Sequence, residues 1–183
     1  MVIDLETTSL DEWNGDIIEI AICELDLENY SYKLIYDSLV GYERVREGAW
    51  IFEHSDLTPE MIKMAYPEKN VFTIANQVRK IVKGSLVTSY NVKFDFAFLS
   101  RSPWRIKEVA EIWYCIMKAA TPICDIEDDY YGTRWPKLTY AYKHIVEKTP
   151  NGSHRASIDC ISASEVLLKL IENNQYTIDN GGN

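Results

Sequence analysis

Apolar and polar residues alternate in short blocks over the first forty residues of the chain. Two blocks, at 16–25 and 32–40, are rich in Ile, Leu, Val and Tyr, and a shorter block with apolar residues spans 2–6. Blocks of this length, separated by turn residues such as those at 11–15, are typical of β-strands. The pattern therefore predicts three consecutive strands.

Beyond residue 70 the apolar positions recur at intervals of three and four residues. This spacing places them on one face of a helix. It predicts helices over 71–82, 107–119, 138–146 and 158–171. Helices therefore dominate the second part of the chain.

Two more strands are expected between these helices. The apolar run at 84–90 predicts a buried strand, and 122–126 predicts a shorter one. Strands followed by alternating helices and strands indicate an α/β protein, with a mixed sheet that helices cover on its faces. We expect one domain over 1–172 and a flexible tail at 173–183, which is polar and rich in glycine at its end.

Composition narrows the class of protein. The net charge of −9 argues against a protein that coats nucleic acid through a basic surface. It remains compatible with an enzyme that holds a few nucleotides and meets their phosphates with divalent cations. No apolar run approaches the roughly 20 residues that span a bilayer, and the N-terminus has no secretory pattern. The four cysteines show no metal-binding spacing, so we expect reduced thiols in a cytoplasmic protein with no membrane association.

Acidic residues occupy positions where a core pattern would place apolar ones. Asp4 and Glu6 are two apart on the first strand, so both point to one face. Asp95 shares a helical face with apolar residues, or it caps a helix that begins at Phe96. These two interpretations of Asp95 are equally compatible with the spacing.

Asp159 lies four residues before Ala163, at the start of the apolar stripe of the last helix. A carboxylate there needs a partner or a metal ion to offset its desolvation, although a helix N-terminus also favours an acid. His154 precedes Asp159 by five residues and is a natural general base beside a metal site, while a lone surface histidine is the commoner case. The oxygen ligands together suit hard cations such as Mg²⁺ or Mn²⁺.

Three motifs now carry a resemblance to a known family. They are DLETT at 4–8, YNVKFDFAFL at 90–99 and HRASID at 154–159. In this order they resemble the exonuclease motifs of the DEDDh 3′→5′ exonucleases, which include ribonuclease T, oligoribonuclease and the proofreading epsilon subunit of bacterial DNA polymerase III. The resemblance covers about residues 1–171. It implies a ribonuclease-H-like fold, with a five-stranded mixed sheet flanked by helices.

The resemblance also implies a reaction. Two Mg²⁺ ions, for which Mn²⁺ substitutes, are held by four carboxylates, and His154 takes a proton from the attacking water. The implied product is a nucleoside 5′-monophosphate. The carboxylates are Asp4, Glu6, Asp95 and Asp159.

Residues next to the motifs are the implied substrate contacts. Leu10 and Phe94 are placed against the terminal base, although both are more typical of plain core. His54 lies in a stretch similar to the family's His-x-Ile-Thr, but with one residue too many before the threonine. The basic residues at 101–107 are candidates for upstream phosphates, or form a solvated loop. The implied substrate-binding set is Thr7, Thr8, Leu10, Asn91 and Phe94.

The expected function is thus a metal-dependent 3′→5′ exonuclease acting on single-stranded nucleic acid with a free 3′ end, with DNA slightly favoured. The alternatives are an RNA-trimming or short-oligonucleotide exoribonuclease and a non-catalytic nucleic-acid-binding module. The intact set of motif residues argues against the non-catalytic module. A polymerase or a second copy of the chain are the further candidate partners.

Overall fold

A computed structural model describes residues 1–128, 132–150, 152 and 154–176. The first three strands are β1 (Val2–Thr7), β2 (Ile17–Asp26) and β3 (Ser31–Leu39), which pair antiparallel in the order β1-β2-β3. All three were predicted to within about one residue. The pairing of β1 with β2 shifts between Glu6 and Thr7, so a bulge ends the regular ladder where the acidic residues lie.

The second pair of strands forms a separate small sheet. β4 (Leu86–Val87) pairs in parallel with β5 (Glu111–Ile112). An isolated parallel bridge joins Val2 to Thr88, and the Ile3 amide donates to the Thr88 carbonyl at 2.9 Å. The described residues therefore form a three-stranded and a two-stranded sheet, joined by this bridge, and not the single five-stranded mixed sheet that was expected.

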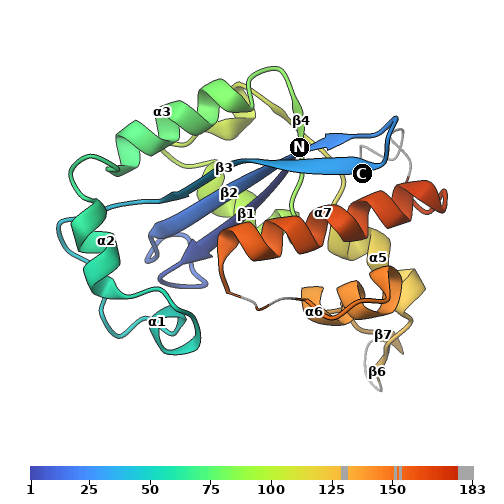
Figure 1. Cartoon of the computed structure of the whole chain (residues 1–183). Coiled ribbons are helices and arrows are strands. Elements are labelled where there is room, and N and C mark those ends of the chain that lie inside the picture. The colour runs from blue at the N-terminus through green and yellow to red at the C-terminus, as the bar shows by residue number, and fades with distance from the viewer. Residues whose placement is uncertain (129–131, 151, 153, 177–183) are drawn as a thin grey trace.

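Helices cover both faces of the sheet, as Figure 1 shows for α7 (Ala156–Glu172) and α3 (Val71–Ile81). Val2 belongs to the core that faces α7, whereas Ile3 and Leu5 belong to the core that faces α3 and α4 (Val92–Leu99). Alternate residues of a strand point to opposite faces, so Asp4 and Glu6 share the face of Val2. The remaining elements are α1 (Ile51–His54), α2 (Pro59–Ala65), a 3₁₀ turn (Ile106–Glu108), α5 (Ile116–Cys124), β6 (Glu127–Asp128), β7 (Gly132–Thr133), α6 (Leu138–Ala141) and a π-helical turn (Tyr142–Val146).

Two predicted elements are wrong. The described residues 107–119 do not form one helix: a 3₁₀ turn, β5 and the start of α5 replace it. By periodicity alone, the apolar run at 112–117 fits a helix or a strand equally well. Its start forms a strand because it pairs with β4. Residues 122–126 are not a strand, because α5 continues to Cys124 and ends where Asp125 adopts a left-handed conformation, at φ +40°.

The helices predicted over 71–82, 138–146 and 158–171 are confirmed, the second as α6 followed by its π-helical turn. The predicted tail is partly packed. Tyr176 is buried, and its hydroxyl donates to the Tyr114 carbonyl at 2.6 Å. Residues 177–183, on which the rest of that prediction falls, lie outside the described part of the chain. Among the described residues, no helix combines the length and apolar character needed to cross a membrane.

Gly41 offers a test of the packing between β3 and α2. A β-carbon at Gly41 would lie 2.4 Å from the Tyr66 nitrogen and 2.5 Å from the Ala65 carbonyl carbon, and both are backbone atoms. We predict that Gly41→Ala lowers the free energy of unfolding by about 1–3 kcal/mol, because the overlap forces backbone to move. Gly48→Ala is the matched control, since an added β-carbon there has no neighbour within 4 Å. Urea unfolding with equal loss in both variants would contradict the prediction.

Candidate active site

The end of β1 presents two carboxylates on one face. Asp4 is half-buried and Glu6 is only 7% exposed. In the register of the sheet Glu6 lies directly opposite Glu19 of β2. Two like charges in that arrangement repel, so this end of the sheet concentrates negative charge.

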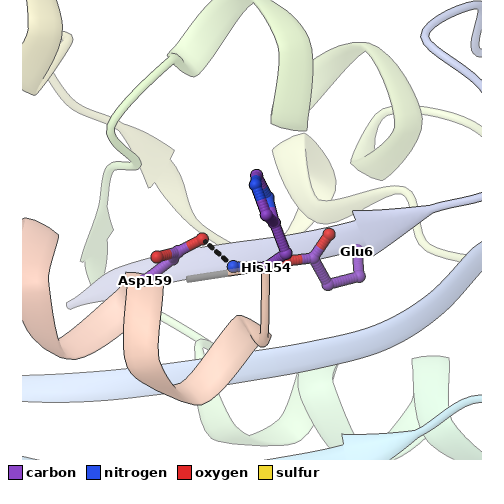
Figure 2. A group of neighbouring side chains, drawn as sticks. All are labelled: Glu6, His154 and Asp159. Carbon is purple, nitrogen blue, oxygen red and sulfur yellow. Dashed lines mark hydrogen bonds between the residues drawn. The ribbon is translucent and has the colours of Figure 1, made fainter. Parts of the chain in front are cut away.

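The start of α7 brings a third carboxylate to the same place. Ligand atoms of Glu6, His154 and Asp159 all lie within 4.8 Å of one another, and Figure 2 shows the three side chains together. The His154 amide donates to Asp159 Oδ2 at 3.1 Å, the dashed line in Figure 2. His154 itself has a left-handed backbone, at φ +60°. A non-glycine residue adopts this conformation at a local cost, and here the turn brings its amide to Asp159.

Asp95 comes from α4, and the structure decides between its two interpretations. α4 begins at Val92 with Asn91 at its N-cap position, so Asp95 lies within the helix and does not cap it. Its side chain is 4% exposed. The negative charge of Asp95 raises the pKa of both Asp4 and Glu6. Glu6, His154 and Asp159 thus form one close group, and Asp4 and Asp95 interact electrostatically with its carboxylates.

Burial and mutual repulsion keep these carboxylates from ionising together. Burial, followed by the charges of Asp159 and Glu19, raises the pKa of Glu6 to about 8. Burial raises the pKa of Asp95 to about 7. The pKa of Asp4 is raised well above its usual range by burial and by the charge of Asp95. Divalent cations fit such a site, because they offer positive charge to oxygen ligands that are otherwise partly protonated at neutral pH.

The sequence did not single out the ion pair that holds the start of α7. Glu19 is 1% exposed and accepts hydrogen bonds from Arg155 Nε at 3.0 Å and Nη2 at 2.6 Å. The Ala156 amide donates to the same carboxylate at 2.8 Å. Arg155 Nε also donates to the second oxygen, Oε2, at 3.2 Å, so the pair is bidentate, and a bidentate pair fixes geometry. It anchors the residues between His154 and Asp159 to β2. One feature of the sequence could have indicated this ion pair. Glu19 is an acidic residue inside an Ile-rich strand, and both faces of that strand are covered.

A cavity of about 730 Å³ opens beside the carboxylates, and it contains most of the predicted substrate contacts. Leu10 is 87% exposed at its rim and is not core, whereas Phe94 is half-buried against Phe98. The Thr8 hydroxyl is already engaged, since it accepts from the Asp16 amide at 2.9 Å. The predicted residues that line the cavity are Glu6, Thr7, Thr8, Leu10, Phe94 and His154.

The lining residues that were not predicted as site residues are Leu5, Ser9, Trp50, Ile51 and Lys137. Trp50 and Lys137 complete the wall of this cavity. The Trp50 ring stacks on His54 at a centroid distance of 4.0 Å and meets the His154 ring edge-on at 5.1 Å. His54 is therefore part of the support for Trp50, and it does not itself line the cavity among the described residues.

The basic segment at 101–107 lies apart from this cavity. The Arg101 guanidinium is 4.7 Å from the Trp13 ring centroid. Arg105 pairs with Glu108 at 3.8 Å. No residue of the segment 101–107 lines the cavity. This favours the solvated-loop interpretation for Arg101 and Arg105.

Solved structures share this fold. A full-length 3′-exonuclease superposes with a TM-score of 0.67 at 15% identity, over 94% of this chain and 60% of that one. E. coli exonuclease I in complex with a dA16 oligonucleotide gives 0.69 at 16%, over 93% and 40%. The same enzyme with a dT13 oligonucleotide gives 0.66 at 18%, over 95% and 41%. The chain thus spans about 40–60% of the length of these proteins.

A comparison with curated proteins gives no match. The family model described as Exonuclease, in contrast, matches residues 1–167. This range contains the four carboxylates and His154, and it ends within α7. The match over nearly the whole chain, together with the shared fold, shows that this chain belongs to the exonuclease family.

Proposed function

We propose that the protein is a 3′→5′ exonuclease that hydrolyses nucleic-acid ends to nucleoside 5′-monophosphates. The observation that carries the proposal is the convergence of buried and half-buried carboxylates from β1, α4 and α7 beside a cavity that also contains His154. Each of these elements comes from a different part of the chain. Acids that served only as helix caps or edge residues would have no reason to meet.

Two Mg²⁺ ions fit the donor set, and Mn²⁺ should substitute for them. The donors are carboxylate oxygens only, which hard cations prefer. Bound cations would supply an activated water and offset the charge on the scissile phosphate. The residues that would hold them are Asp4, Glu6, Asp95 and Asp159.

His154 is the proposed general base. Its ring lines the cavity and lies within 4.8 Å of carboxylate oxygens of Glu6 and Asp159. An imidazole accepts a proton near neutral pH, so it can take one from the attacking water. The Trp50 ring, edge-on to His154, limits the positions that the imidazole can adopt.

The cavity is proposed to hold the 3′-terminal nucleotide. Phe94 and Leu10 offer apolar surface to the base, and Lys137 offers a cation to a phosphate. Contacts to the face of a base are tolerant of its identity. This tolerance is what an enzyme needs to remove successive nucleotides.

Single-stranded DNA is the proposed substrate. The oligonucleotides dA16 and dT13 are bound by E. coli exonuclease I, which shares the fold. We place DNA slightly ahead of RNA on this basis. RNA remains the alternative, because the choice depends on contacts to the 2′-hydroxyl.

The cation site makes the stability of the protein depend on pH. The pKa of Glu6 rises from 4.5 to about 8 on folding. The folded state therefore keeps a proton that the unfolded chain releases, and stability falls as pH rises between these values. In EDTA we predict a Tm about 5 °C lower at pH 8 than at pH 5.5.

Saturating Mg²⁺ should remove this decline of Tm with pH, since a ligand in hundredfold excess over its Kd adds about 2.7 kcal/mol to the free energy of unfolding. Asp4→Asn should respond to Mg²⁺ far less than the exposed control Asp56→Asn. Equal thermal shifts in these two variants would place the cations elsewhere.

Removal of the general base should reduce turnover without loss of binding. We predict that His154→Ala lowers the single-turnover cleavage rate by roughly 10²–10⁴-fold, the usual contribution of a positioned base. His144→Ala is the control, because His144 is exposed and stacks on Tyr140 in another part of the fold. With saturating Mg²⁺ and a labelled oligonucleotide, a His154→Ala rate within about threefold of wild type would refute the assignment.

A further inference from the structure

A second cavity, of about 530 Å³, lies next to the active site. It opens between the first turn of α4 and the start of α5. Trp113 and Met117, both buried, contribute to its wall. Asn91 also lines this cavity and does not line the first one, although the sequence grouped it with the substrate contacts.

The charge of this cavity is opposite to that of the whole protein. Lys93 and Lys118 line it and are both exposed. None of its described lining residues is acidic, whereas the chain carries 28 acidic and 19 basic residues. A concave surface with cations and no carboxylate attracts anions.

An exposed aromatic ring completes the cavity. Trp135 is 57% exposed and lies at its rim. Its neighbour Pro136 is held in place, because the Tyr90 hydroxyl donates to the Pro136 carbonyl at 2.8 Å. Tyr90 is buried and lies two residues before the start of α4, so the segment that carries Trp135 is anchored next to that helix.

The two cavities share a wall. Phe94 and Lys137 line the active-site cavity, and Lys93 and Trp135 line the second one. Lys93 and Phe94 are adjacent in α4, and Trp135 and Lys137 flank Pro136. A chain with its end among the carboxylates can therefore pass over this wall into the second cavity.

We propose that the second cavity binds the nucleotides upstream of the scissile bond of a single strand. Lys93 and Lys118 contact phosphates, and a base stacks on Trp135. Alternating cations and aromatic rings are how proteins hold single strands without reading their sequence. The inference rests on the proposed function, because it assigns the rest of the substrate once the 3′ end occupies the active site.

This site makes the enzyme prefer oligonucleotides over very short substrates. A dinucleotide reaches only the first cavity, whereas dT8 also fills the second. Each base stacked on an aromatic ring and each neutralised phosphate then adds affinity. The ratio of the Kd values for dT2 and dT8 is the quantity that reports on the second cavity alone.

The experiment measures both Kd values by fluorescence anisotropy in EDTA, which prevents cleavage. Trp135→Ala should lower the dT2/dT8 ratio of Kd values about tenfold, and Trp135→Phe should keep most of the wild-type ratio. The double variant Lys93→Gln, Lys118→Gln should lower the ratio and reduce the slope of log Kd against log salt for dT8 by about 1.4. The controls are the exposed Lys80→Gln and Phe72→Ala on α3.

Ratios equal to those of the two controls would overturn the proposal, provided that circular dichroism shows the variants folded. The proposed function is tested separately, by Mg²⁺-dependent shortening of labelled dT8 by the wild type. Shortening with unchanged ratios refutes the second cavity alone. No shortening, with changed ratios, refutes the nuclease while the binding site stands.

Discussion

Repulsion among the carboxylates at the end of β1 is the constraint that the rest of the structure has to accommodate. Glu6 and Asp95 are almost fully buried, and burial raises the pKa of each toward or above neutrality. A fold without a use for this arrangement would gain stability by replacing the acids with apolar residues. We propose that the acids are retained because the site binds divalent cations, which offset the repulsion among them.

A residue of β2, Glu19, holds the start of α7 in place at this site. Glu19 lies opposite Glu6 in the sheet and its charge adds to the repulsion, which the charge of Arg155 partly offsets. Arg155 satisfies it with a bidentate ion pair, and the Ala156 amide joins the same carboxylate. One buried acid thereby places the start of α7, which carries Asp159 toward β1.

Local patterns predicted the parts of the fold and site that depend on local spacing. The period of two put Asp4 and Glu6 on one face, and the helical stripe put Asp159 at the start of α7, as found. The sequence pattern was insufficient to predict the parts of the structure that depend on contacts between distant residues. The run at 112–117 was predicted as helix because its pairing with β4 is invisible in the pattern. Trp50 was missed because α1 has only four residues, too few to show a period. Glu19 was missed because its partner Arg155 is 136 positions away.

The direction of hydrolysis is the measurement that distinguishes a 3′→5′ exonuclease from any other role of this site. A single-stranded oligonucleotide is labelled at its 5′ end or at its 3′ end and incubated with the protein and Mg²⁺. We expect the 5′ label to yield a ladder shortened one nucleotide at a time and the 3′ label to appear at once in a mononucleotide. EDTA or Asp4→Asn should abolish both. Release of the 5′ label first, or the same products in EDTA, would contradict the proposed function.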